Sequence, residues 1–222
     1  MHSTLKQLEF VQNKINEIIN IKQLKTNPKI IVITKTFPSK NIVPLLEYGH
    51  MHYGENKIQE AEGKWTGIRN KYKNFQLHMV GKLQTNKVKK AVKLFDYIHS
   101  LDNERLALKI FQYQKELNKE VKLFIQINLA AEKEKSGLAI NNLNSFYKYC
   151  VNKLSLNIVG LMCLPPIHDN TGKYFKLLKK NSEDFNLKEL SMGMSSDFEN
   201  AILNGSTFLR LGTVIMGRRN TI

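Results

Sequence analysis

Hydrophobic residues follow two different periods along this chain. Near the N-terminus, apolar residues at helical spacing predict one helix with a buried face, at Leu8, Val11, Ile15, Ile18 and Ile19. Beyond it, short runs rich in β-branched and aromatic residues predict eight strands, at 29–34, 50–54, 75–80, 97–101, 121–129, 157–162, 189–193 and 207–212. Segments of helical character separate consecutive strands, for example at 41–49, 57–65, 103–117 and 196–205.

Strands that are separated by helices must run parallel, because a βαβ crossover imposes that direction. We therefore predict an α/β fold, a single (β/α)8 TIM barrel with an extra N-terminal helix, in which residues 1–222 form one domain. An open, doubly wound sheet is the structural alternative. Its glycine-rich G-x-G-x-x-G turn is missing after the first strand, where the sequence reads Lys35-Thr36-Phe37-Pro38.

The first predicted strand ends in a lysine, which is unusual for a segment built to be buried. Strand side chains alternate, so Lys35 shares a face with Ile31 and Ile33 and stands at the barrel mouth if those two fill the interior. Desolvation lowers the pKa of an amine and makes it a usable nucleophile towards a carbonyl. Lys35 therefore suits a Schiff base, and the alternative is a solvated lysine at the point where the strand stops.

The last predicted strand carries an arginine towards the same end of the barrel. In TFLRLGTVIMG, Arg210 and Gly212 alternate with leucines and share one face. A guanidinium inside a barrel needs an anion or an acceptor, because it cannot escape the desolvation cost by losing its proton. Gly212 and Thr213 follow at the place where barrels often hold phosphate.

The loop after the seventh strand adds to this predicted phosphate site. In SMGMSSDFENAI, Ser196 and Glu199 have the spacing of a capping box and predict a helix that begins there. The N-terminus of that helix would add N–H groups and a partial positive charge beside Ser195. Each loop alone is ordinary turn or cap chemistry, but together they predict a phosphate cup.

Three other polar residues received a separate interpretation. Asn56 follows the second strand and is either a donor to a ligand at the barrel mouth or an ordinary N-cap. We interpret His78, on a predicted strand, as a hydrogen-bonded core residue and leave it out of the site. Lys135, in a charged segment, is most simply a surface lysine.

The formal charge of +15 suggests a basic, nucleic-acid-associated protein as one alternative. The basic residues are nearly all lysine and are spread along the chain with frequent Asn and Ile, so we favour a compositional bias and expect no specific nucleic-acid partner. No segment reaches the roughly 18 apolar residues of a membrane span, and the N-terminus lacks the features of a secretory signal. The two cysteines, Cys150 and Cys163, form no disulfide framework, so we expect a soluble, cytoplasmic protein.

A nucleophilic lysine, an arginine and a phosphate cup at one barrel mouth suit an aldehyde that carries a phosphate. Pyridoxal 5′-phosphate (PLP) has both groups, and a Schiff base to lysine is how proteins hold it. The residues therefore favour PLP as the cofactor, and none of them suggests a metal site.

The same segments resemble the pyridoxal-phosphate homeostasis proteins, the alanine-racemase N-terminal-domain-like family. VITKTFP is similar to the family's V-(S/A)-K-T-x-P lysine motif, HYGENKIQE to F-G-E-N-x-x-Q-E, and LHMVGKLQTNK to W-H-x-I-G-x-L-Q-x-N-K. YIHSLDN, EKSGL, IVGLMCLPP, LSMGMSSDFENAI and RLGTVIMGRR follow in the family's order, from about residue 29 to the C-terminus. The chain departs from the pattern at Leu77, Lys82 and Cys163, which affects the rim of the site and none of the expected cofactor positions.

The resemblance implies a barrel of PLP fold type III with PLP held as a Schiff base on Lys35. The other cofactor-binding positions that it implies are Asn56 beside the ring, Arg210 at the pyridine nitrogen, and Met194, Ser195, Gly212 and Thr213 at the phosphate. A cation at the pyridine nitrogen disfavours the protonated ring and weakens the electron sink that carbanion chemistry uses.

The resemblance further implies a protein that carries or buffers PLP and supports intracellular PLP homeostasis. We expect a monomer that passes PLP to an incoming amine. Apo forms of PLP enzymes are the candidate recipients. The enzyme alternative is a PLP-dependent, racemase-like protein. Racemases of this type add a C-terminal β-domain whose tyrosine is a second acid–base group, and the sequence leaves no room for one after the last strand, so we expect no turnover.

Overall fold

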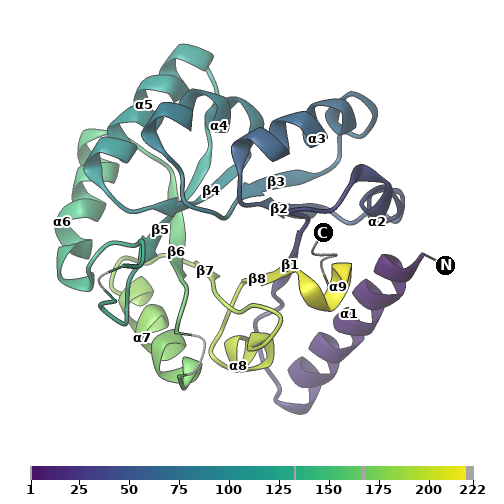
Figure 1. Ribbon diagram of the computed structural model, residues 1–222. Coiled ribbons are helices and arrows are strands. Elements are labelled where there is room, and N and C mark those ends of the chain that lie inside the picture. Colours follow the sequence, from purple (N-terminus) through teal and green to yellow (C-terminus); the bar gives the residue numbers. More distant parts are fainter. Residues whose placement is uncertain (1, 133, 167–168, 219–222) are drawn as a thin grey trace.

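The computed structural model describes residues 2–132, 134–166 and 169–218; Arg219, at the end of the last motif, lies outside them. Over these residues the chain forms a closed barrel whose parallel strands are hydrogen-bonded in sequence order, with β8 pairing with β1. Figure 1 shows the strands at the centre and the helices around them. The (β/α)8 prediction is confirmed, and the open-sheet alternative is wrong.

The strands lie within two residues of their predicted bounds at each end. They are β1 (Lys29–Ile33), β2 (His52–Glu55), β3 (Gln76–Met79), β4 (Tyr97–Leu101), β5 (Lys122–Ile127), β6 (Ile158–Cys163), β7 (Glu189–Ser191) and β8 (Phe208–Leu211). The α-helices are α1 (Ser3–Ile21), α2 (Val43–Glu47), α3 (Ile58–Lys71), α4 (Val88–Leu94), α5 (Glu104–Leu117), α6 (Leu143–Lys148), α7 (Thr171–Glu183), α8 (Phe198–Leu203) and α9 (Thr213–Met216).

The extra N-terminal helix, α1, belongs to the outer layer of the barrel. Its predicted apolar face is buried at Leu8, Val11 and Ile15. This face packs against α8, α9 and α2, so the first helix lies beside the last one (Figure 1). In addition, the side chain of His2 accepts a hydrogen bond from the N–H of Thr4 and caps the start of the helix.

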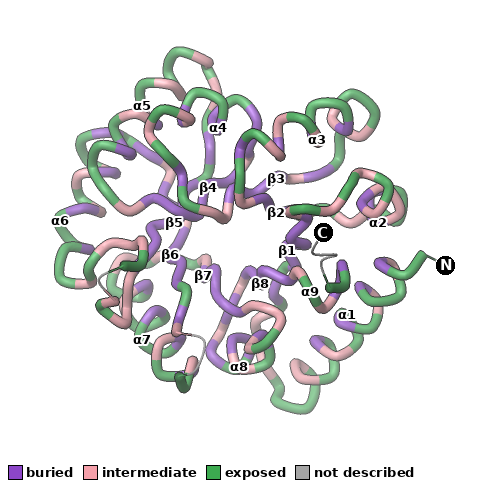
Figure 2. The backbone as a smooth tube through the Cα atoms, in the orientation of Figure 1, coloured by how far each residue is buried: buried purple, intermediate pink, exposed green. Residues whose placement is uncertain are grey.

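Two apolar clusters stabilise the barrel. The larger one lies between strands and helices and includes the fully buried Trp65 and Phe75. The smaller one consists of inward-facing strand residues, namely Ile31, Ile33, Tyr97, Phe124, Met162 and Phe208. In Figure 2 the buried residues accordingly gather at the strands, and the exposed residues lie on the outer helices. The first strand therefore points Ile31 and Ile33 inward, as its alternation predicts.

Histidines add polar groups to this interior. His78 and His99 are completely buried, and His52 lies at the start of β2. Burial is the largest cause that lowers the pKa of His78 and His99 well below the usual value. Burial likewise lowers the pKa of His50 and of His52 to about 4. These four imidazoles are therefore neutral at neutral pH.

No helix among the described residues is both long and apolar enough to cross a membrane.

We expect the protein to lose stability as the pH falls from about 6.5 towards about 4. In this window the unfolded chain binds protons on these four histidines and the folded chain does not, so the free energy of unfolding decreases. Each fully buried group contributes up to about 1.4 kcal/mol per pH unit.

Urea unfolding at about pH 7 and at about pH 5.5 measures this loss, because most carboxylates stay ionised between these two values. A His50→Asn variant should show a smaller difference between the two conditions than the unmodified protein. Equal stability of the unmodified protein at both values would contradict the prediction.

Candidate functional site

A pocket of about 650 Å³ lies at the carboxyl ends of the strands. The residues that line it lie in or directly after β1 and β8, or follow β2, β3, β6 and β7. All positions that the sequence analysis selected are among them, namely Lys35, Asn56, Met194, Ser195, Arg210, Gly212 and Thr213. The fold thus brings the predicted lysine, the arginine and both predicted phosphate loops to one place.

The pocket is cationic and partly apolar. Among the described residues that line it, Lys35 and Arg210 are the charged ones, and no carboxylate is present. The uncharged polar side chains are those of Asn56, Ser195, Ser196 and Thr213. The apolar side chains are Ile33, Phe37, Val80, Leu164 and Met194. This combination suits a flat, partly apolar ligand that carries negative charge.

Lys35 precedes a strained turn. The next residue, Thr36, has a φ of 68°, in the left-handed region that β-branched residues rarely adopt. The N–H of Thr36 donates a hydrogen bond to the carboxylate of Glu60 on α3, which holds the turn. The chain therefore leaves the barrel directly after Lys35, while the lysine side chain stays in the pocket.

A buried carboxylate ties the end of β1 to the end of β2. Glu55 is completely buried, and its Oε1 accepts hydrogen bonds from Thr34 Oγ1 at 2.7 Å, Lys64 Nζ at 2.8 Å and Trp65 Nε1 at 2.9 Å. Lys64 Nζ also donates to the carbonyl oxygen of Thr34 at 2.8 Å. The cationic partner and the two further donors all bind Oε1, while Oε2 is buried without a hydrogen-bond partner among the described residues. Since Thr34 and Glu55 directly precede two pocket residues, this network sets the spacing between them.

Arg210 lies between the barrel interior and the pocket and is only 4% exposed. Its NH1 donates to Ser191 Oγ at 2.7 Å, and its NH2 donates to the carbonyl oxygen of Cys163 at 2.9 Å. Burial lowers its pKa from the ordinary value, but a guanidinium stays protonated at neutral pH. Burial also raises the pKa of the Cys163 thiol to about 12, so this neighbour is neutral. Among the described residues no carboxylate forms an ion pair with Arg210, and its charge is available to a ligand.

The two loops that were predicted to hold phosphate are joined. The N–H of Val214 donates to Ser195 Oγ at 3.4 Å, which links the loop after β7 to the first turn of α9. Thr213 begins α9, and Gly212 precedes it. Hydroxyl groups and the first N–H groups of a helix therefore face one region of the pocket.

The predicted capping box of Ser196 and Glu199 is wrong. The N-cap of α8 is Asp197, and Glu199 forms an ion pair with Lys14 of α1 instead. Asp197 Oδ1 accepts a hydrogen bond from the N–H of Met194 at 2.6 Å. The aspartate thus turns back towards the pocket loop and orders it, which local spacing alone did not reveal.

Other interpretations from the sequence are now decided. The N-cap of α3 is Lys57, so the N-cap alternative for Asn56 is wrong. His78 is buried, hydrogen-bonded to two histidines and absent from the pocket lining, as predicted. Lys135 is exposed and forms an ion pair with Glu132 at 2.7 Å. Within the described part of the chain, no cluster of three or more His, Cys, Asp or Glu residues is arranged to hold a metal.

Sequence reasoning missed three apolar residues of the pocket, Phe37, Val80 and Leu164. Val80 carried a usable signal, because it follows the inward-facing His78 by two positions and shares its face. Phe37 and Leu164 lie in loops, where no periodicity indicates the direction of a side chain.

Gly193 determines the path of the loop that contains Ser195. Its φ is +91°, and a Cβ there would lie 2.5 Å from the Cβ of Ala201 and 2.9 Å from a methyl group of Leu209. We expect Gly193→Ala to lower the free energy of unfolding by about 2 to 4 kcal/mol, because it adds both backbone strain and overlap. Chemical denaturation measures the change.

Gly67→Ala is the matched control. Gly67 is exposed on α3, and nothing lies within 4 Å of the added Cβ, so the same substitution should raise the free energy of unfolding by about 1 kcal/mol. A Gly193→Ala protein as stable as the unmodified chain would show that the loop has another path available.

Sequence comparison relates the chain to known proteins over most of its length. Residues 9–220 match the family described as alanine racemase, N-terminal domain. A pyridoxal phosphate homeostasis protein from Aquifex aeolicus is 34% identical, with 86% of this chain and 87% of that protein covered. Another with the same name from Pasteurella multocida is 31% identical, with 94% of each covered.

Structural comparison agrees. PipY from Synechococcus elongatus, solved without PLP, has a TM-score of 0.82 and 31% identity, with 91% of this chain and 100% of that chain covered. The structure of PipY with PLP bound has a TM-score of 0.80. An alanine racemase from Clostridium difficile has a TM-score of 0.72 at 13% identity, and this chain covers 58% of it, which shows a shared fold alone.

Proposed function

We propose that this protein binds PLP and supports PLP homeostasis. The chain belongs to the alanine racemase N-terminal domain family and, within it, to the pyridoxal phosphate homeostasis proteins. The observation that carries this proposal is the pocket at the barrel mouth, which combines a lysine, a buried arginine and hydroxyl groups without any carboxylate among its described lining residues. PLP carries an aldehyde, a pyridine ring and a phosphate dianion, so its charge and shape match that lining.

The residues have distinct roles in this proposal. The amine of Lys35 would hold the aldehyde. The joined loops that contain Ser195 and Thr213, together with Met194 and Gly212, would hold the phosphate. Asn56 would contact the ring, and Arg210 would interact with the pyridine nitrogen.

The same lining supports a carrier and not an enzyme. When bound, PLP supplies an electrophilic aldehyde and an electron-accepting ring. A cation at the pyridine nitrogen disfavours the protonated ring and so weakens that electron sink. Racemisation also needs an acid–base group on each face of the substrate carbon. Among the described lining residues no histidine, carboxylate, tyrosine or cysteine is present to join Lys35 in that role.

Carrying PLP requires a route for release. An incoming amine that reaches the pocket mouth would take the place of the Lys35 amine, which would be set free and remain in the pocket. We propose the apo forms of cytoplasmic PLP enzymes as recipients and a monomer as the carrier. The loop residues Phe37 and Leu164, which line the pocket, are candidates for contact with such an amine.

We expect the protein to take up PLP with a visible absorption band and, after borohydride reduction, to yield one pyridoxyl-modified peptide that contains Lys35. Absorption spectroscopy followed by peptide mass mapping measures both. Lys35→Ala should lose the band and the adduct. Lys57→Ala, which removes an exposed lysine close to the pocket in sequence, should keep both. Modification scattered over many lysines in the unmodified protein would reject the proposal.

We expect no turnover of amino-acid stereochemistry by the PLP-loaded protein above the level of the Lys35→Ala variant. The physical reason is that the described residues lining the pocket offer no second acid–base group. Incubation of L-alanine in deuterated water, followed by chiral separation and measurement of deuterium at the α-carbon, tests this. D-alanine formed at a rate that depends on Lys35 would favour the racemase-like alternative.

A further inference from the structure

A continuous file of hydrogen-bonded side chains runs through the barrel interior from Arg210 to the opposite end. Arg210 NH1 lies 2.7 Å from Ser191 Oγ, which lies 2.9 Å from His99 Nδ1. His99 Nε2 lies 2.9 Å from His78 Nδ1, and His78 Nε2 lies 3.1 Å from His52 Nδ1. Five different strands, β8, β7, β4, β3 and β2, each contribute one member, so the file exists only in the closed barrel.

Aromatic rings enclose the file and fix its orientation. His78 stacks on Tyr97 with 4.3 Å between ring centroids, and His99 stacks on Phe124 at 4.2 Å. The ring of Phe208 is tilted against His78, with centroids 5.5 Å apart. Both histidines are completely buried. Their ring nitrogens therefore meet apolar walls on the sides and polar partners along the file.

Each imidazole of the file carries a single proton. Burial lowers the pKa of His78 and His99 well below the usual value, and the charge of Arg210 lowers that of His99 further. A neutral imidazole has one N–H donor and one acceptor nitrogen. Each contact between two ring nitrogens needs one proton, so all the rings must donate in the same direction along the file.

Arg210 sets that direction. A guanidinium only donates, so Ser191 Oγ accepts from it, and the hydroxyl proton of Ser191 needs an acceptor of its own. Within reach among the described residues, this acceptor is His99 Nδ1. His99 must then carry its proton on Nε2 and donate to His78 Nδ1, and His78 must donate in turn to His52. The opposite direction would leave a buried hydroxyl without an acceptor, which costs about 1 to 3 kcal/mol.

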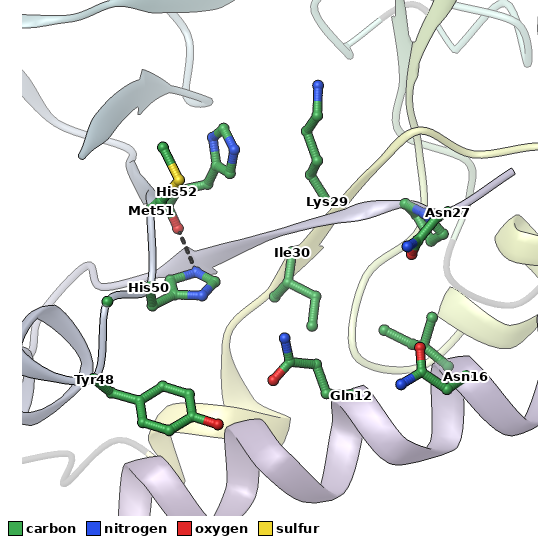
Figure 3. A pocket seen from close by; sticks show the side chains of 12 residues that line it. Gln12, Asn16, Asn27, Lys29, Ile30, Tyr48, His50, Met51 and His52 are labelled. Carbon is green, nitrogen blue, oxygen red and sulfur yellow. Dashed lines mark hydrogen bonds between the residues drawn. The ribbon is translucent and has the colours of Figure 1, made fainter. Parts of the chain in front are cut away.

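The far end of the file opens into a second pocket. His52 lines a cavity of about 620 Å³ at the amino ends of β1 and β2, together with Lys29, Gln12 and His50. Figure 3 shows these side chains around the cavity, with the ring of His50 hydrogen-bonded to the backbone oxygen of His52. The last proton of the file, on His52 Nε2, can therefore reach solvent. A neutral file that ends in solvent adds no counter-charge near Arg210.

We propose that Ser191 and His99 are positioning residues for the cofactor site, and that His78 and His52 fix the tautomer of His99. The file orients the guanidinium of Arg210 with neutral acceptors and adds no negative charge to it, so that Asp197 is the carboxylate that favours its charged form among the described residues. A carboxylate in the position of Ser191 would orient the arginine equally well but would neutralise it. This inference rests on the proposed function in one respect, namely that PLP binds opposite Arg210.

The first test needs no cofactor. Nuclear magnetic resonance of the PLP-free protein with isotope-labelled histidine distinguishes the two neutral tautomers and the charged ring. We expect His52, His78 and His99 to be neutral Nε2–H tautomers at about pH 7. Ser191→Ala removes the donor to His99 and should let its tautomer change, while Ser191→Thr, which keeps a hydroxyl, should preserve it. A charged ring or an Nδ1–H tautomer at His99 in the unmodified protein would overturn the proposal.

The second test measures what the file does for the bound cofactor. We expect Ser191→Ala to bind PLP about tenfold more weakly and to shift the absorption band of the bound form, because Arg210 loses an acceptor that orients it. Ser191→Thr should restore both properties. Tyr97→Phe is the control, since the hydroxyl of Tyr97 bonds to Lys122 outside the file while its ring keeps the stacking on His78.

The two proposals can fail separately. If the unmodified protein forms no adduct on Lys35, the proposed function is wrong. The histidine tautomers then still show whether the file donates in the proposed direction. If the adduct forms and Ser191→Ala binds PLP with unchanged affinity and spectrum, the positioning role is wrong. Thermal unfolding of each variant shows whether it is folded. If Ser191→Ala does not fold, the tautomer of His99 in the unmodified protein and in Ser191→Thr still decides the test.

Discussion

The permanent charge of Arg210 is the constraint on which the candidate site depends. A guanidinium cannot lose its proton, so a barrel that buries one must satisfy its N–H groups or bring an anion to it. This barrel uses a hydroxyl and a backbone carbonyl, both neutral, and places Arg210 in the lining of a pocket that holds no carboxylate among its described residues. The hydrogen bonds orient the cation, and its charge remains for a ligand.

The end of the neighbouring strand β1, which leads to Lys35, is held in a different way. Around Lys35, the supporting network is charged, with the buried carboxylate of Glu55 paired to Lys64 and bonded to Thr34 and Trp65. This network connects the strand ends to α3. Its charged residues, Glu55 and Lys64, neutralise each other and are not among the residues that line the pocket. The two networks thus combine rigid support with a positively charged lining, which suits an anionic ligand.

Much of the fold was predictable because strand and helix periods are local properties. Eight strands were located correctly, and the inward direction of Ile31 and Ile33 followed from simple alternation. Alternation also placed Lys35, Arg210 and Gly212 towards the same mouth. The exception was the start of α8, where the spacing of Ser196 and Glu199 suggested a cap. In the folded protein, Glu199 forms an ion pair with Lys14 of α1, and Asp197 accepts a hydrogen bond from the N–H of Met194.

The sequence by itself determined the elements, their parallel order and the types of chemistry that the strand ends present. It did so because burial period, turn residues and the alternation of strand side chains depend only on neighbours along the chain. Only the tertiary structure decided which of those groups meet. Ser191, His99, His78 and His52 come from four separate strands, and no local pattern relates them. Their hydrogen bonds, and so the direction in which the file donates, exist because barrel closure brings these strands around one axis.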